Sequence, residues 1–555
     1  MNLLTHGFLA KKGFFLQALL LMATFVIGTN VLAQTEEKIY SPQPGAPLFE
    51  KIGDLHHPVS TDSPQAQKYF DQGLTLVYGF NHAEAVRSFK AVTRLDPDCA
   101  MGYWGVALAL GPNINKPMDP KDVPEAVANA HKAYTLMSKT TAREKAYISA
   151  IVERYSLDPS ARRTALDSAY AEAMDKARKN FPEDLDAATL YAESIMDLMP
   201  WNYYNDDLSP KPATIKVTEI LESVLEKDPN HPGANHYYIH AVEPSETPGR
   251  AEGAADRLGG LVPDAGHLVH MPSHIYLRIG RYSDATKANE QAALSDESYI
   301  SQCNAQGFYP ALYYPHNVHF MWYTTSLEGR SRESIAAALK LHQKVSARLA
   351  DGPRFLERFL PTPLFAYARF GKWQEILNYQ QPRADFEYET AMWRFTRGLA
   401  FLNTGKIDEA QNELSALQSF EDSENMSSLN KTLVEIAVLV LAGEIAMKNG
   451  DADDGIAKLQ TAVGKQDGLP YMEPPYWYFP VRHYLGAAFL ESGKAEEAEK
   501  VYRKDLKKNP LNGWSLFGLG KTLTSLGKTD EAAKVQKQFK KSWPKADVKL
   551  TSSRF

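Results

Sequence analysis

Residues 235–240 read NHYYIH and residues 269–274 read VHMPSH, so the same pattern of histidines returns after 34 residues. Residues i and i+4 share one face of a helix, and each segment therefore places two imidazoles on one helical face. Self-similarity at this period is typical of stacked helix-turn-helix units and predicts an all-α solenoid. Because successive units present corresponding positions on the same side, four side chains should converge: His236, His240, His270 and His274.

Along the rest of the chain, large, small and proline residues follow the order of a tetratricopeptide repeat. The order is clearest near the C-terminus, where it occurs at Gly486, Phe489, Gly493, Ala498, Tyr502 and Pro510 and again at Leu516, Gly520, Leu523, Gly527, Ala532 and Pro544. In this respect the chain resembles the tetratricopeptide repeat family. The resemblance implies a right-handed superhelix of about ten helix-turn-helix units. The alternative is an irregular helical-repeat protein of another class.

Residues 1–33 are predicted to be a secretory signal peptide. Lys11 and Lys12 precede an apolar segment, residues 14–27, and small residues come directly before Gln34. We therefore expect an exported bacterial-type protein, periplasmic or secreted, with no transmembrane segment once the signal is removed. An N-terminal membrane anchor is the alternative, although the apolar segment is short for a membrane span.

Three further parts follow the signal peptide. Residues 34–62 contain several prolines and little periodicity, which predicts an extended lead-in. Helical patterning then continues to the C-terminus. We divide it into a central superhelix with a histidine-rich groove, residues 63–350, and C-terminal tetratricopeptide repeats, residues 351–555.

Charge, cysteine content and motifs exclude some classes of function. The chain has 61 basic and 67 acidic residues, and removal of two signal-peptide lysines leaves a net charge of −8. A general nucleic-acid-binding protein needs a basic face, so nucleic acid is not an expected partner. The two cysteines can form at most one disulfide bond. The sequence lacks the usual motifs of zinc proteases, thiol redox proteins, serine hydrolases and nucleotide enzymes.

The family resemblance gives each histidine a position in its helix. In tetratricopeptide repeats, the second, fifth, ninth and twelfth residues of the first helix line the concave groove. In units that begin at Pro232, Gly266 and Pro315, histidines take these positions at His236, His240, His267, His270, His274, His316 and His319. The same register brings Glu243 to the groove, and Glu193 reaches it from the preceding unit.

The chemical interpretation of this cluster is a metal site. Neutral imidazoles bind zinc, copper and iron, and a carboxylate commonly completes such a ligand set. Because five to seven histidines exceed one tetrahedral site, we expect either two metals or one metal with further histidines around it. Glu193 and Glu243 are the candidate proton acceptors of a metal-dependent reaction. The residue types leave both hydrolysis and oxidation open.

A binding scaffold without chemistry of its own is the second interpretation. Fold does not imply function, and tetratricopeptide proteins mostly bind partners. The groove would then hold a small molecule, a peptide or a glycan in the cell envelope. The C-terminal repeats, which have no histidine cluster, would offer a surface to a protein partner. Duplication of an ancestral unit would explain the repeated histidines without a metal.

Overall fold

The computed structural model describes residues 45–555 except 304, 306–307, 348 and 350–353. The predicted signal peptide and the predicted boundary at residues 350–351 lie outside the described residues. Within these ranges the chain forms helices and connecting segments, with β-pairing limited to isolated bridges. No helix in the described part of the chain has both the length and the apolar character needed to cross a membrane.

Helices that follow one another in the chain pack together, as α2 packs against α3 and α25 against α26. The first set of helices is α2 Pro64–Tyr78, α3 His82–Leu95, α4 Ala100–Leu110, α5 Val123–Thr135, α6 Ala142–Glu153, α7 Arg163–Asn180, α8 Leu185–Asp197, α9 Pro212–Lys227, α10 Pro232–Val242, α11 Glu252–Leu261, α12 Gly266–His270, α13 Pro272–Ile279 and α14 Tyr282–Cys303. The second set is α15 Phe308–Leu327, α16 Ser331–Ser346, α17 Thr362–Arg369, α18 Trp373–Leu377, α19 Glu387–Asn403, α20 Ile407–Gln418, α21 Ser428–Lys448, α22 Ala452–Asp467, α23 Arg482–Glu491, α24 Ala495–Lys508, α25 Gly513–Ser525 and α26 Thr529–Ser542. The all-α arrangement of helix-turn-helix units is confirmed.

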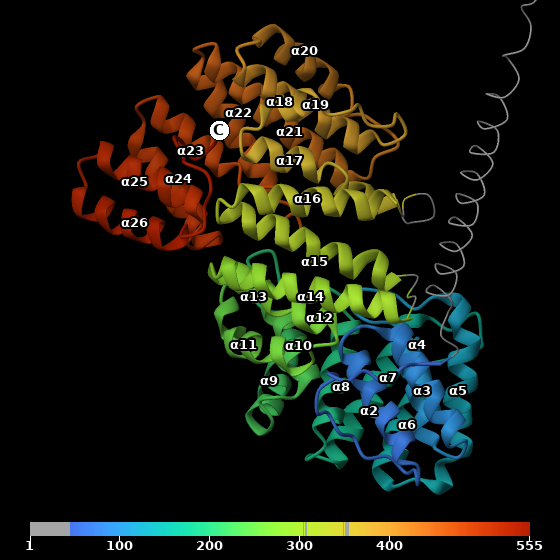
Figure 1. Ribbon diagram of the computed structural model, residues 1–555. Coiled ribbons are helices and arrows are strands. Elements are labelled where there is room, and N and C mark those ends of the chain that lie inside the picture. Colours follow the sequence, from blue (N-terminus) through green and yellow to red (C-terminus); the bar gives the residue numbers. More distant parts are fainter. Residues whose placement is uncertain (1–44, 304, 306–307, 348, 350–353) are drawn as a thin grey trace, which may run out of the picture.

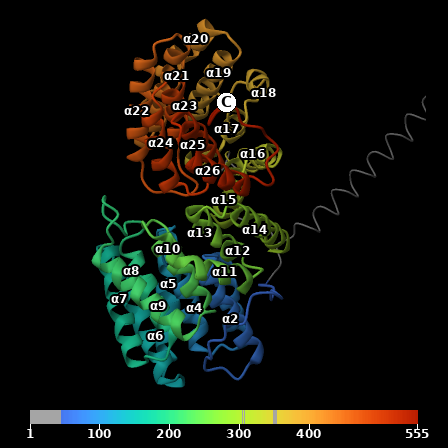
Figure 2. The ribbon, with the colours of Figure 1, turned by 90° about the vertical axis from the view of Figure 1, so that its left-hand side faces the viewer.

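Two large hydrophobic cores divide the helices into two lobes (Figure 1, Figure 2). The N-terminal lobe contains α2 to α14, and the C-terminal lobe contains α16 to α26; Leu277 of α13 and Tyr282 and Ala293 of α14 pack in the second core. Helix α15 joins them, because Tyr309 and Tyr313 pack in the first core whereas Phe320 and Trp322 pack in the second. The junction between the lobes therefore lies at the histidine-rich helices.

Side-chain caps fix where two helices near this junction begin. The Ser63 hydroxyl accepts a hydrogen bond from the backbone N–H of Ala66, and Pro64 occupies the first turn of α2. His231 caps α10 in the same way, because its Nδ1 accepts a hydrogen bond from the N–H of Ala234. These caps hold the two helices in the register that positions the histidines of α10.

Two helix boundaries differ from the predicted repeat register. We expected one helix from Gly266 onward, but α12 ends at His270 and α13 begins at Pro272. Proline has no N–H to donate to the preceding turn, which explains the interruption. The third histidine-bearing unit was expected to begin at Pro315, whereas α15 begins at Phe308 and contains that proline. The insertion before this unit therefore extends helical structure.

The two cysteines, Cys99 and Cys303, are both buried and free. Burial raises the pKa of Cys99 to about 11 and that of Cys303 to about 12. Both thiols are therefore protonated near neutral pH, the form that is neither a good nucleophile nor a good metal ligand.

Candidate metal centre

Helix α10 carries its histidines into the interior, because every residue from Pro232 to Val242 is buried. The helix packs against α2, α8, α9, α11 and α13. His236 and His240 lie one turn apart, and neither is more than 1% exposed. These imidazoles therefore line an interior site instead of an open groove.

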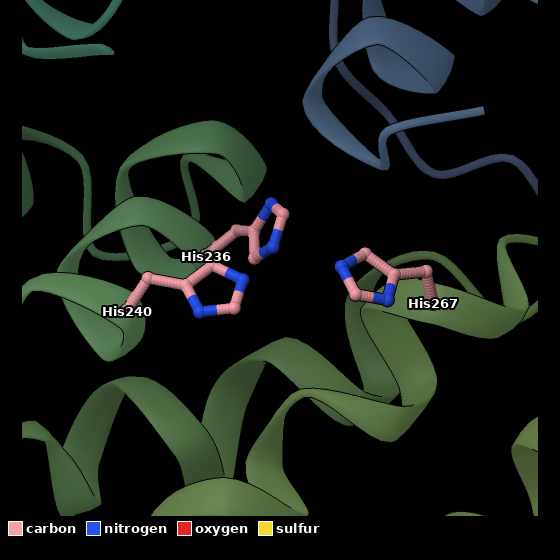
Figure 3. Close-up of side chains that lie close together, drawn as sticks. All are labelled: His236, His240 and His267. Carbon is pink, nitrogen blue, oxygen red and sulfur yellow. The ribbon is translucent and has the colours of Figure 1, made fainter. Parts of the chain in front are cut away.

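His236, His240 and His267 form the first histidine group, in which the rings point toward one another (Figure 3). Each ring offers one nitrogen, and the three nitrogens lie within 4.8 Å of one another. His236 Nδ1 donates to the carbonyl of Tyr78 over 2.5 Å, and His240 Nδ1 donates to Glu243 Oε1 over 2.7 Å. These bonds place the protons on Nδ1 and leave lone pairs on Nε2. Among the described residues, neither Nε2 atom has a hydrogen-bond partner, and the same holds for both nitrogens of His267.

The first histidine group has the properties of a ligand set for a cation. Burial lowers the pKa of His236 and His267 well below the usual value, and neighbouring imidazoles lower it further. The rings are therefore neutral at physiological pH, which is the form that binds metal. Metal-binding histidines commonly donate their other N–H to a carboxylate or a backbone carbonyl, as His236 and His240 do. Buried polar atoms that converge without partners are otherwise rare in proteins.

His270, His274 and His316 form the second histidine group, again with one ligand atom from each ring within 4.8 Å of the others. His270 Nδ1 donates to Asn289 Oδ1 over 2.6 Å, which leaves its Nε2 2.9 Å from His274 Nε2. Two ring nitrogens at this separation can share a proton or bind the same ion. His316 is half-buried, and burial lowers its pKa well below the usual value.

Glu243 connects the two histidine groups. Its Oε1 accepts the hydrogen bond from His240, and its Oε2 lies 2.5 Å from His274 Nδ1. Burial alone would raise the pKa of Glu243, but the two imidazoles lower it well below its usual range. Burial alone would likewise lower the pKa of His274, but Glu243 and Glu473 raise it to about 10. Glu243 is therefore a carboxylate that holds one imidazole of each group.

A segment of the C-terminal lobe, between α22 and α23, completes the site. Glu473 Oε2 lies 3.4 Å from His274 Nδ1, and the Tyr471 hydroxyl lies 3.3 Å from Glu243 Oε2 and also contacts Glu473. Burial raises the pKa of Glu473, and the charge of Glu243 raises it further. The sequence did not identify either residue, because the segment has no helical period and lies far along the chain. Its run of prolines and aromatic residues, residues 470–480, was the available signal.

The histidine groups open onto a cavity of about 530 Å³ at the junction of the lobes. This volume lies in the range of small-molecule sites. Aromatic side chains form much of its wall: Trp201, Tyr313, Trp322, Phe359, Phe365, Tyr388, Tyr476 and Tyr478. Arg358 adds a cationic side chain to the wall. The expected concave groove is therefore a partly open cavity at the histidines, with α15 and the segment from the C-terminal lobe contributing to its wall.

Two of the predicted site residues lie apart from the histidine groups. His319 lines the cavity, but its ring stacks on Trp322 with the centroids 5.1 Å apart, and it belongs to neither group. Glu193 lies in a buried charge cluster with Arg154 and Asp197, and burial raises its pKa. It is not among the residues that line the cavity. The structure therefore brings six of the seven predicted histidines and Glu243 together, without Glu193.

The comparisons with known proteins give a family match near the C-terminus and structural matches along most of the chain. Residues 485–547 match the model of the tetratricopeptide repeat family, so this part of the chain consists of tetratricopeptide repeats. No curated protein matches the sequence. Among solved structures, the chain is similar to the APC/C hetero-tetramer Cut9–Hcn1, with 12% identity and a TM-score of 0.28 over 94% of this chain and 80% of that chain. It is also similar to the human IFIT1 dimer with m7Gppp-AAAA, with 12% identity and a TM-score of 0.29 over 87% of this chain and 90% of that chain. Similarity at these TM-scores does not identify a ligand.

Proposed function

We propose that this chain is an exported metalloprotein that binds transition metal ions at the two histidine groups and acts on a small molecule in the cavity. One observation carries the proposal. His236, His240 and His267 converge with buried nitrogens that lack hydrogen-bond partners among the described residues, and Tyr78 and Glu243 fix the tautomers of two rings. This arrangement of ligands and supporting hydrogen bonds is typical of metal centres.

The donor types limit the metal to a small set. Imidazole nitrogens without cysteine suit zinc, copper and iron. The first histidine group offers three neutral imidazole nitrogens, whereas an ion in the second group would displace a proton from His274, whose pKa Glu243 and Glu473 raise to about 10. Glu243 lies between the groups, which supports two ions close together. Such ions supply Lewis-acid or redox chemistry at the wall of the cavity.

Glu243 has a positioning role in this proposal. Both of its oxygens are engaged by imidazoles, so it orients His240 and His274 and balances charge. From the sequence we expected Glu193 and Glu243 to accept protons. These contacts support that role for neither residue. Glu193 lies in its own charge cluster, and Glu243 is occupied.

The size of the cavity, about 530 Å³, supports an enzyme acting on a small molecule. Zinc in the purified protein would direct assays to hydrolysis, whereas copper or iron would direct them to oxidation. Elemental analysis of the untagged protein, purified without added metal or chelator, tests the proposal directly. We expect one or two equivalents of metal at the histidine groups of the native protein and of His131→Ala, which alters an exposed histidine of α5. Absence of metal, with none taken up on titration with zinc, copper and iron, would overturn the proposal.

Partner binding by the C-terminal repeats is a second candidate function. It is supported by the family match at residues 485–547, which lie outside the cavity wall. Isolation of the full chain from its native envelope fraction would test for a bound protein, peptide or glycan. Retention of the same partner by a chain that lacks residues 485–547 would argue against these repeats as the docking surface.

Export rests on the sequence of residues 1–33. N-terminal sequencing of the protein from envelope and culture fractions tests it. A mature chain that begins at Gln34 would support signal cleavage, whereas an intact N-terminus in the cytoplasm would contradict it.

A further inference from the structure

A second hollow, of about 540 Å³, lies in the N-terminal lobe and shares no lining residue with the cavity at the histidine groups. Its walls are residues 52–58 of the extended lead-in, the beginnings of α8 and α10, and the end of α11. Two helix N-termini alone would favour an anion. The side chains reverse this preference, because the wall contains one arginine, Arg143, and five carboxylates: Asp54, Glu183, Asp184, Asp186 and Asp228.

Three side chains of this hollow have the placement of metal ligands. His57, Asp184 and Asp186 each offer one ligand atom, and the three atoms lie within 4.8 Å of one another. His57 Nδ1 lies 2.6 Å from Asp186 Oδ2, and a carboxylate can only accept, so Nε2 carries the lone pair. In the part of the chain that the structure describes, this Nε2 is buried and has no hydrogen-bond partner. The His57 side chain is only 3% exposed.

Asp184 supplies a second buried atom without a hydrogen bond. Its Oδ1 accepts hydrogen bonds from the Tyr147 hydroxyl over 2.9 Å and from the N–H of Ala187 over 3.1 Å, which caps α8. Its Oδ2 has no hydrogen-bond partner among the described residues, and Arg143 Nε lies 3.9 Å from it. The cap and the tyrosine therefore fix the carboxylate while leaving one oxygen available to a cation.

Asp186 is held by three other elements of the lobe. Its Oδ1 accepts a hydrogen bond from the Tyr78 hydroxyl over 2.6 Å and lies 3.3 Å from His231 Nε2. Burial would raise the pKa of Asp186, but His231 and His57 lower it well below its usual range. The carboxylate therefore stays charged in the interior, and its orientation is set before any ligand binds.

We propose that His57 and Asp184 bind one divalent transition metal ion, independently of the two histidine groups, and that Asp186 holds the His57 ring in place through Nδ1. An imidazole nitrogen and a carboxylate oxygen are donors that suit zinc and manganese, and a carboxylate on the other ring nitrogen is the usual support of a metal-binding histidine. The ion would fasten the lead-in, which carries His57, to the beginning of α8, which carries both aspartates. Its role is structural, because it ties a segment without secondary structure to the helical body.

Counting bound metal in matched variants tests this site. Asp184→Asn keeps the helix cap and the oxygen that faces Tyr147, because asparagine caps helices as well as aspartate, and it removes the charge. The apoprotein would be titrated with Zn²⁺ and separately with Mn²⁺. We expect Asp184→Asn and His57→Ala each to lose one equivalent, or to bind it at least about tenfold more weakly. His56→Ala is the control, since that side chain is 61% exposed and lies outside the ligand group.

Two further measurements keep the test decisive. His236→Ala, which alters the first histidine group, should retain the equivalent assigned to His57, so failure at one site is distinguishable from failure at the other. Should His57→Ala not fold, anomalous scattering from native crystals soaked in Mn²⁺ decides. A peak among the three side chains supports the site. No peak there, or an unchanged metal count in Asp184→Asn, would overturn it.

Discussion

His236 is the fifth residue of α10 and His483 is the second residue of α23, both of them groove-lining positions in the predicted register, and both side chains are fully buried. Their surroundings differ. His483 Nδ1 accepts from Arg369 over 3.1 Å, and its Nε2 donates to Asp505 over 3.1 Å, so both nitrogens are satisfied within the protein. His236 has only the bond from Nδ1 to the Tyr78 carbonyl.

The contrast shows that burial and register do not by themselves identify a metal ligand. A histidine that serves the fold finds a partner for each nitrogen, as His483 does, because an unpaired buried polar atom costs about 1–3 kcal/mol. The three imidazoles of the first histidine group have ring nitrogens without hydrogen-bond partners among the described residues, so they bear this cost. The two kinds of histidine differ in whether both ring nitrogens have hydrogen-bond partners. A sequence does not show this property.

The largest expected effect, and the strongest test of this comparison, is at His236. We expect His236→Ala to lose the part of the metal stabilisation that comes from the first histidine group, about 2.7–4.1 kcal/mol when free metal exceeds the Kd of that site by about 100- to 1,000-fold. Chemical denaturation with metal and with chelator measures this difference, and packing losses cancel because each protein is compared with itself. His131→Ala should respond to metal as the native protein does. An equal response in His236→Ala would remove this residue from the ligand set.

The opposite result is expected at His483. His483→Ala should lower the free energy of unfolding by about 3 kcal/mol, since it leaves the buried Asp505 and Arg369 without their shared partner. We expect the lower end of the usual range because Asp505 also accepts hydrogen bonds from Asn512 and Ser515. Urea denaturation measures the loss, and elemental analysis should find the metal content unchanged. Metal loss from a folded His483→Ala protein would contradict the distinction drawn between the two histidines.

Much of the fold could be predicted from the sequence because its signals are local. Near the C-terminus, regularly spaced glycines and prolines predict where helices end. The family match confirms tetratricopeptide repeats there, at residues 485–547. The histidine pair of α10, His236 and His240, follows from the i,i+4 rule alone. These features depend on residues within a few turns of one another.

The arrangement of the candidate site depends on contacts that local patterns do not contain. Each histidine group combines residues from different helices, because α12 gives His267 to the first group and His270 to the second. Glu473 reaches His274 from the other lobe through a segment without helical period. Glu193 has the helix position predicted for the groove, but the structure places it in a buried cluster with Arg154 and Asp197.

A smaller effect is expected where the two histidine groups meet. Glu243→Gln keeps the shape of the side chain but can accept from only one of its two imidazole partners through oxygen. We expect metal affinity to fall about 10- to 100-fold, as is usual when a group that orients a metal-binding histidine is changed. Competition with a chelator of known affinity measures the change, and Glu246→Gln, on the exposed loop that follows, is the matched control. Equal affinity in Glu243→Gln would show that this carboxylate does not orient the ligands.

The last effect is a change in the pH dependence of stability and concerns two buried aspartates, one in each region. Asp505 has a lowered pKa because His483 and its hydrogen bonds outweigh burial, whereas burial raises the pKa of Asp296, beneath α12, to about 7. Between pH 4 and 7 the folded chain keeps a proton on Asp296 that the unfolded chain has lost. Stability from this group is therefore complete below pH 4 and falls as pH rises toward 7, by at most about 1.4 kcal/mol per pH unit.

Asp296→Asn tests this assignment, because the amide does not titrate. Asp296 accepts hydrogen bonds from Tyr309 and Asn317, and an asparagine oxygen can replace one of these acceptors. We expect the slope of unfolding free energy against pH to become more positive between pH 4 and 7 in the variant, with the two profiles parallel above pH 8. Asp505→Asn should change the slope with the opposite sign at lower pH, since its lowered pKa makes stability fall as pH falls. Identical profiles for Asp296→Asn and the native protein would show that the proton on Asp296 does not stabilise the histidine-rich lobe.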